Sequence, residues 1–322
     1  MLNYLLYVLQ DPNARWILLG SMLLGLSSGV LGSFAYLRKQ SLMGDALAHA
    51  ALPGVCIAFM LTGSKSILLF LLGAAVAGLI ATFGIGYVTR NSRIKQDTAL
   101  GIVLSVFFGL GIVLLTKIQH SGAGNQSGLD KFLFGQAASM VYADVVTMAI
   151  VAVLLVVTCS LLFKEFKLLS FDPGFAKGIG LPVGVLDQLM MFLIVVAVVV
   201  GIQAVGVVLM SALLITPAVS ARYWTDRLGV MVVLSGLFGA LSGFIGTFVS
   251  GMGSNLPTGP LSVLAATALF ILSVLFAPRR GLAAKLLEQL SVKRTVIREL
   301  EQQPQRSGVR ANAQQSREGG GL

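Results

Sequence analysis

Two side chains that could bind a transition metal lie four residues apart in an apolar stretch. Asp45 and His49 belong to SLMGDALAHAALPG, residues 41–54, and His49 is one of only two histidines in the chain. Residues i and i+4 share one face of a helix, and a carboxylate with an imidazole suits Mn, Fe or Zn. The spacing is equally compatible with a structural Asp–His hydrogen bond. A metal would also need further ligands, from water or from other segments, because two donors do not complete a coordination shell.

The composition indicates a membrane protein built from many helices. Of 322 residues, 56% are hydrophobic and only 11% are charged, whereas soluble domains carry about 25% charged residues. The apolar runs reach the roughly 20 residues that a membrane helix needs, and they lack the alternation of strands. The sequence therefore predicts an all-α polytopic protein with nine spans at 16–37, 42–62, 66–88, 98–116, 142–163, 186–204, 206–221, 229–250 and 259–277. The sixth and seventh spans are nearly continuous, so eight spans are the alternative.

Basic residues are distributed unevenly between the two sides of these spans. If the spans alternate and Arg38 and Lys39 are cytoplasmic, nineteen of the 23 basic residues lie on the cytoplasmic side. Membrane proteins carry their positive charge on that side. The pattern predicts a plasma-membrane protein with an external N-terminal segment, 1–15, and a cytoplasmic C-terminus. The net charge of +10 then requires no nucleic-acid partner, and no basic–aromatic patch suggests one.

The depth of Asp45 in the membrane does not follow from the spans. Asp45 is six residues past Lys39, about 9 Å along a helix, so it would lie near the inner surface unless the intervening turn enters the membrane. Pro53–Gly54 follows it and predicts a kink, as does Pro217 in a second span. Paired interrupted helices mark the binding sites of some carriers. The similarity of the two proline segments is weak, and chance explains it equally well.

A polar segment between two spans, 164–188, predicts a short helix outside the membrane. Asp172 can cap its start with Pro173 in the first turn, and Gly178 and Gly180 can end it. Such a helix could dock a partner, or the segment could be an ordinary connecting loop. Further on, residues 281–303 predict an amphipathic cytoplasmic helix, and the polar, glycine-rich residues 304–322 predict a disordered tail.

The other reactive residue types favour structural roles. We expect a solvated His120 in an outer loop, buried apolar roles for Cys56 and Cys159, and lipid or core contacts for the methionines at 190, 191 and 210. Asp97 and Asp187 are expected to be favourable charges at helix N-termini. The sequence contains no phosphate-binding loop of the G-x-x-x-x-G-K-[ST] type and no catalytic triad. The chain is therefore not expected to be an enzyme, and ATP-driven transport would require another chain.

Four stretches together resemble the metal-ion family of bacterial ABC importer permeases, the manganese/zinc/iron type. They are SLMGDALAHAALPGV (41–55), FLFGQ (132–136), FDPGFAKGIGLP (171–182) and GVVLMSALLITPAVSAR (206–222). They occur in family order, and the resemblance covers most of residues 15–280 but not the tail beyond about 285. SLMGDA followed by LPG is closer to the manganese branch than to the zinc branch.

The resemblance implies a permease domain of the metal-ion/cobalamin-like type over residues 16–280. Such permeases work with a second permease, copy or paralogue, with cytoplasmic ATPase subunits and with an external metal-binding lipoprotein. Asp45 and His49 would contact the transported ion, manganese or alternatively zinc or iron, with no permanently bound cofactor. Segment 164–185 would be the element that couples to the ATPase, through Phe171, Asp172, Pro173, Phe175, Ala176, Gly178 and Gly180.

Two other functions fit the residues without the resemblance. One is a self-contained carrier driven by protons or sodium, with Asp45 and His49 as a proton relay. The other is a membrane scaffold with no transport role.

Overall fold

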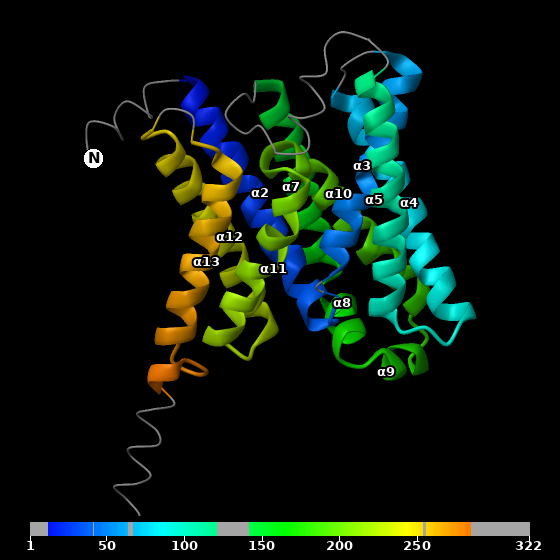
Figure 1. Ribbon diagram of the computed structural model, residues 1–322. Coiled ribbons are helices and arrows are strands. Elements are labelled where there is room, and N and C mark those ends of the chain that lie inside the picture. Colours follow the sequence, from blue (N-terminus) through cyan, green and yellow to red (C-terminus); the bar gives the residue numbers. More distant parts are fainter. Residues whose placement is uncertain (1–11, 41, 64–66, 121–141, 254–255, 285–322) are drawn as a thin grey trace, which may run out of the picture.

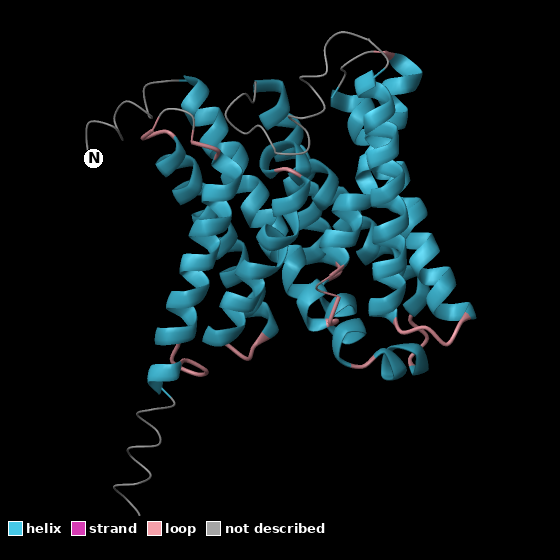
Figure 2. Cartoon of the chain, viewed as in Figure 1, coloured by secondary structure: helices cyan, strands magenta, loops and turns pink. Residues whose placement is uncertain are grey.

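The computed structural model describes residues 12–40, 42–63, 67–120, 142–253 and 256–284. All regular structure in that part of the chain is helical (Figure 2). Nine long helices run between the two ends of the molecule (Figure 1): α2 (Pro12–Leu37), α3 (Met43–Thr62), α4 (Ile67–Asn91), α5 (Gln96–His120), α7 (Tyr142–Leu161), α10 (Val183–Val205), α11 (Val207–Trp224), α12 (Leu228–Ser250) and α13 (Thr258–Phe276). Eight of them are long and apolar enough to cross a membrane, and α11 is a shorter helix of 18 residues. The all-α, multi-span prediction is confirmed.

Helices α2 and α12 make the most extensive helix–helix contact in the described part of the chain, and small residues line it. A Cβ atom placed on Gly239 would lie 2.0 Å from the carbonyl oxygen of Gly25, and one on Gly25 would lie 2.1 Å from that of Gly239. Hydroxyl groups bridge the same contact: Ser235 Oγ donates to the Gly29 carbonyl at 2.6 Å, and Ser21 Oγ lies 2.6 Å from Thr247 Oγ1. Lipid supplies no hydrophobic force between helices, so small residues and such bonds hold membrane helices together.

Helix α3 is the second centre of packing, against α4 and α5. Its Gly54 approaches the backbone of α4, where a Cβ atom would lie 2.1 Å from the Gly73 carbonyl oxygen. Its Leu52 packs on Gly111 of α5. The N-terminal two thirds of α3 is buried except at Asp45 and His49, which are intermediate in exposure. The helix thus turns two polar side chains toward its least covered side.

The break between α10 and α11 is a single residue, Gly206, with φ of 89° and ψ of 165°. A residue with a Cβ atom rarely adopts that backbone conformation. The turn separates the predicted sixth and seventh spans into two helices that run in opposite directions (Figure 1). In the described residues, the predicted sixth and seventh spans are therefore two separate helices rather than one interrupted unit.

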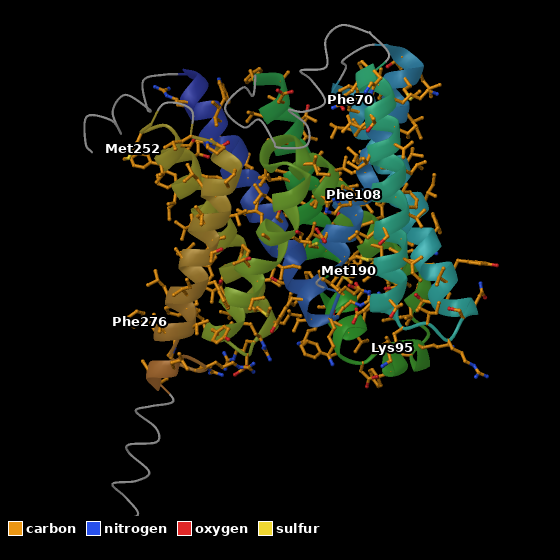
Figure 3. The ribbon with its side chains drawn as sticks, viewed as in Figure 1. Phe70, Lys95, Phe108, Met190, Met252 and Phe276 are labelled. Carbon is orange, nitrogen blue, oxygen red and sulfur yellow. The ribbon has the colours of Figure 1, made fainter. Side chains whose placement is uncertain are left out.

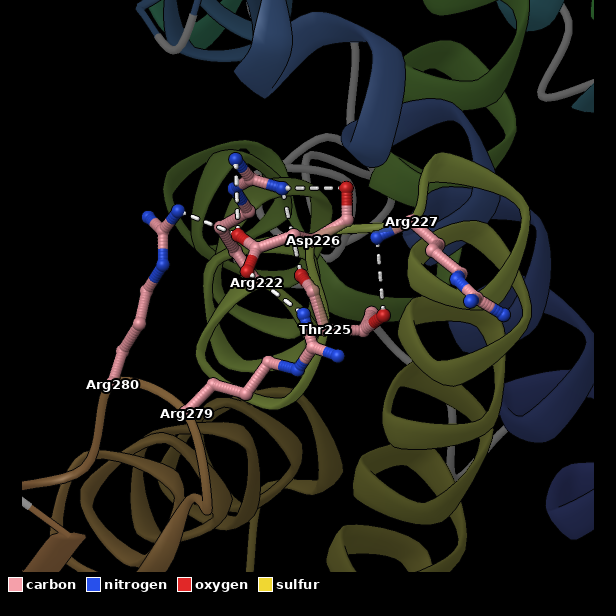
Figure 4. Close-up of polar contacts among 6 residues, drawn as sticks. All are labelled: Arg222, Thr225, Asp226, Arg227, Arg279 and Arg280. Carbon is pink, nitrogen blue, oxygen red and sulfur yellow. Dashed lines mark hydrogen bonds and ion pairs between the residues drawn. The ribbon is translucent and has the colours of Figure 1, made fainter.

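The basic end of the molecule, at the bottom of Figure 1, carries the short helices α8 (Phe163–Phe171) and α9 (Pro173–Gly178). At the same end, Asp226 in the α11–α12 turn pairs with Arg279 at 3.2 Å and with Arg280 at 2.6 Å, just beyond α13 (Figure 4). Arg222 completes the cluster at 3.5 Å from the same carboxylate. These contacts tie the end of α13 to the turn before α12.

Several predicted segments lie wholly or mainly outside the described residues. These are FLFGQ at 132–136, the amphipathic segment 281–303 and the tail 304–322. Of the predicted external segment 1–15, residues 12–15 belong to the first turn of α2.

Candidate functional site

Asp45 and His49 lie side by side on the first turns of α3. Nε2 of His49 is 3.5 Å from Oδ1 of Asp45, and 17% and 38% of the two side chains, respectively, are exposed. The side chain of Ser211 on α11 also interacts with the Asp45 carboxylate. The His49 ring packs edge-on against Phe108 of α5, with ring centroids 4.8 Å apart at 74°. Three helices therefore position this pair.

The pair lies well inside the membrane-spanning region. Phe108 is in the middle of the 25-residue helix α5, and in Figure 3 it lies between Phe70 near one end of the molecule and Lys95 at the other. On α2 and α3, Gly32 and Gly44 both face Leu214, so the chain turns back after Leu37 and begins α3 at the level of Gly32. Helix α3 therefore begins deeper in the bundle than α2 ends, which places Asp45 at that depth.

Pro53 lies inside α3, one turn beyond His49. Proline has no N–H group, so the carbonyl oxygen four residues earlier loses its partner within the helix; that residue is His49. Pro217 has the same effect on Leu213 in α11. Pro53 therefore lies on α3, the helix that carries the Asp–His pair, and Pro217 lies on α11, which contacts the pair through Ser211.

The donor atoms have a spacing that fits a shared metal ion. With bonds of about 2.0–2.2 Å, two adjacent ligands of a tetrahedral ion lie about 3.4 Å apart, close to the observed separation. Nδ1 of His49 is buried and has no hydrogen-bond partner among the described residues. No group of three or more His, Cys, Asp or Glu gathers in the described part of the chain. Asp45 and His49 alone therefore do not complete the coordination shell of an ion held here.

The predicted exposed helix is α9, and its ends are as expected from the sequence. Oδ1 of Asp172 accepts the Phe175 N–H at 2.8 Å, and Pro173 is in the first turn. The helix ends at Gly178, and Gly180 has φ of +86°. Ala176 is buried against the body of the protein, which leaves Phe171, Phe175 and Ile179 each more than half exposed. Apolar side chains exposed in this way indicate a contact surface.

Most of the remaining predicted residues lie where expected, with two corrections. Cys56 and Cys159 are buried free thiols, and the three methionines are in the core. The prediction that Asp187 is a helix-start charge is wrong: it lies in the second turn of α10 and pairs with Arg38 in the α2–α3 turn. His120 is exposed but is the last residue of α5 rather than a loop residue, with Nδ1 2.8 Å from the Thr116 carbonyl oxygen.

Sequence reasoning missed Phe108 and Ser211, the two neighbours of the Asp–His pair. Phe108 is one of 18 phenylalanines, and Ser211 shares helix α11 with Thr216 and Ser220, which also carry hydroxyl groups. Only the helix arrangement distinguishes them from similar residues elsewhere.

The family model described as the ABC 3 transport family matches residues 10–277. The chain belongs to this family. Among relatives of this ABC 3 member, the manganese transport system membrane protein MntC of Bacillus subtilis is 57% identical over 291 residues, which cover 90% of this chain and 67% of the relative. The zinc transport system membrane protein TroC of Treponema pallidum is 46% identical, with coverage of 88% and 96%.

A solved structure agrees with the fold. PsaBC from Streptococcus pneumoniae in complex with Fab superposes with a TM-score of 0.76 and 34% identity, over 86% of this chain and 96% of that one. The helix arrangement described above is therefore that of an ABC 3 permease.

Proposed function

We propose that this chain is the permease subunit of an ATP-driven importer of manganese. Similarity to manganese permeases supports this substrate, and the single observation that carries the site is the Asp45–His49 pair at mid-depth. Asp45 supplies charge and replaces part of the ion's hydration shell. Neutral His49 adds a nitrogen ligand, which disfavours Mg and Ca because those ions prefer oxygen. Zinc is the second candidate, because TroC is also similar, at 46% identity.

The test is uptake of radiolabelled manganese and zinc by cells that contain the complete transport system. We expect Asp45→Asn and His49→Ala each to lower uptake at least about tenfold, as loss of a metal-site group does, while the amount of inserted protein is unchanged. The matched controls are Asp97→Asn and His120→Ala, at exposed positions on α5, which should retain uptake. Normal manganese uptake by both site variants would refute the ligand assignment. Uptake by the isolated chain in liposomes without nucleotide would instead favour a self-contained carrier.

ATP hydrolysis then occurs on a separate cytoplasmic subunit, and α8 and α9 dock on it. The exposed Phe171, Phe175 and Ile179 support this role. Motion of the ATPase would shift the permease between conformations that differ in their contacts with these helices. The second permease and the external binding lipoprotein complete the importer.

Copurification tests the docking surface. Phe171→Ser with Phe175→Ser should reduce the amount of ATPase recovered with the permease, and Phe276→Ser, an exposed phenylalanine at the same end of the molecule (Figure 3), should not. Gly178→Val and Gly180→Val should each reduce recovery of the ATPase as well. Gly180 has a positive φ that valine rarely adopts, and the new side chain at Gly178 would project from the surface, because its Cβ meets nothing of this chain within 4 Å. Unchanged recovery in the phenylalanine double variant would remove α8 and α9 from the interface.

The orientation follows from the basic residues at the end where α8 and α9 lie. We place that end in the cytoplasm and the N-terminus outside, in keeping with the preference for positive charge inside. In intact cells, a membrane-impermeant maleimide should label Gly253→Cys but not Ser92→Cys. Both native cysteines are buried, so they give little background, and the reverse labelling pattern would invert the topology.

A further inference from the structure

A cavity of about 530 Å³ lies between α4 and α10 near the basic end of the molecule. The two helices touch at Gly78 and Val195, where a Cβ atom on Gly78 would lie 2.8 Å from the valine side chain. From there toward the basic end they leave space between them. Met43 of α3 also lines the cavity. Met43 and Asp45 are two residues apart and so point to opposite sides of α3, and the cavity is therefore separate from the candidate metal site.

The cavity is apolar at its deeper end and polar at its outer end. Leu79 and Phe83 of α4 and Met191 and Phe192 of α10 line the deeper part. The last turn of α4 and the α2–α3 turn line the outer part, with Arg90, Asn91, Arg38 and Gln40. A phospholipid that stands in the membrane has the same order, with acyl chains inside and its headgroup at the surface.

The charge of the outer part favours an anion. Arg38 and Arg90 are the cations of the lining and Asp187 is its anion. Arg38 is paired with Asp187, whereas Arg90 has no ion-pair partner in the described part of the chain. The net charge of the lining is therefore one positive unit, which one phosphodiester group would neutralise.

Gln40 adds a polar group that the protein itself leaves unsatisfied. Its side chain lines the cavity and the residue is only 4% exposed. Its Oε1 atom has no hydrogen-bond partner among the described residues. Buried polar atoms normally have partners, so this carbonyl favours a headgroup that carries a donor, such as a glycerol hydroxyl.

The mouth of the cavity faces the outside of the helix bundle. The opening runs along α4, because Phe83 in the deeper part and Tyr87 nearer the outer end are 61% and 71% exposed. Tyrosine side chains such as Tyr87 concentrate at the membrane–water interface. A lipid can therefore enter sideways from the bilayer.

We propose that this cavity binds one anionic phospholipid of the phosphatidylglycerol class from the leaflet at the basic end. Arg90 and Arg38 hold its phosphate, the Gln40 amide bonds its headgroup, and its acyl chains lie along Phe83 and Phe192. The bound lipid fills the space between α4 and α10, next to Met43 at the start of α3.

Native mass spectrometry of the full chain, purified in detergent with added phosphatidylglycerol, tests the proposal. Arg90→Gln should lower retention of the lipid about fivefold, the effect of one basic residue near an anionic headgroup. Arg93→Gln is the matched control, since it removes the same charge three residues later from a side chain outside the cavity, and it should retain the lipid. Equal retention by the two variants would overturn the site.

A steric pair gives an independent readout. A Cβ atom on Gly86, which lines the cavity, or on Gly101 of α5 would meet nothing within 4 Å. Gly86→Leu should fill the cavity and abolish retention while the variant still folds, and Gly101→Leu should leave retention unchanged. Equal retention by both variants would exclude this cavity as the lipid site.

The ligand class is tested with three probes and a crosslink. Phosphatidylglycerol should raise the thermal unfolding temperature more than phosphatidylcholine does, and more than glycerol phosphate, which lacks acyl chains. An equal effect of the zwitterionic lipid, or of glycerol phosphate, would overturn the assignment. A photocrosslinker at Tyr87 in native membranes should capture lipid, and capture of a protein chain there would assign the cavity to a protein partner instead.

Discussion

The α2–α12 contact and the Asp45–His49 pair show two different uses of polar groups inside an apolar protein. Between α2 and α12, hydroxyl groups bond to carbonyl oxygens and to each other, and small residues exclude everything else. Ser21, Ser235 and Thr247 carry no charge and have hydrogen-bond partners within the protein. On α3 an ionisable pair is partly exposed, and Nδ1 of His49 has no partner in the described part of the chain.

The difference separates groups that hold the fold from the pair that we propose to bind the transported ion. An ionisable side chain within a membrane is costly and normally faces a pathway or cavity, whereas hydroxyl–carbonyl bonds between helices cost little to bury. The first region should therefore control stability without affecting ion selectivity. The second should control transport with little effect on stability.

Gly239→Leu should have the largest effect of these variants, on the yield of folded protein. The new side chain would strike the Gly25 backbone, because even its Cβ would lie 2.0 Å from that carbonyl oxygen. Overpacking typically costs about 1–3 kcal/mol, and a clash with backbone cannot relax by side-chain rotation. We expect little folded protein in size-exclusion chromatography, whereas Gly101→Leu should give a normal yield. A normal yield and unfolding temperature for Gly239→Leu would mean that α2 and α12 separate easily.

A smaller, selective effect should follow from Phe108→Ala. The aromatic contact with His49 is worth about 0.5–1.5 kcal/mol, so the manganese concentration for half-maximal uptake should rise roughly two- to twelvefold. The unfolding temperature should change no more than in Leu110→Ala, a neighbouring exposed position on α5. If Phe108→Ala lowers stability but leaves half-saturation unchanged, Phe108 belongs to the structural class of residues.

Ser235→Ala should affect stability alone. It removes the bond to the Gly29 carbonyl oxygen, and a hydrogen bond between membrane helices averages about 0.6 kcal/mol. We expect a slightly lower unfolding temperature with unchanged manganese uptake. Ser105→Ala is the control, because its hydroxyl bonds only within α5, to the Gly101 carbonyl oxygen. A transport defect in Ser235→Ala would show that the α2–α12 contact moves during transport.

Local patterns were sufficient to predict much of this molecule. Long apolar runs predicted the helices because a membrane span is recognisable from its own residues. The cap at Asp172 and the i, i+4 relation of Asp45 and His49 are local in the same sense. The boundaries of α9 and the adjacency of the pair therefore follow from the sequence.

Features that depend on contacts between distant segments could not be predicted. The depth of Asp45 depends on the turn after Leu37, where the chain folds back against α11. The partners Phe108 and Ser211 depend on how α5 and α11 pack. Asp187 appeared to be a helix-start charge because nothing in its own segment points to Arg38, 149 residues away. Among 37 glycines, only the packing reveals that Gly25 and Gly239 meet.

The smallest effect should come from Asp226, an exposed charge cluster that belongs to neither region. The hydrogen bond from Arg279, reinforced by Arg280 and Arg222, holds the pKa of the Asp226 carboxyl below its usual value. A lowered pKa in the folded state means that the contribution to stability is complete above the ordinary value of about 3.9 and is lost as the pH falls through the folded-state pKa. Asp226→Asn should therefore unfold at a slightly lower temperature at neutral pH, with a difference that shrinks below about pH 4. Thermal unfolding in detergent across this pH range measures it, with Asp97→Asn as the control. A difference that is independent of pH would show that the cluster does not act through the Asp226 charge.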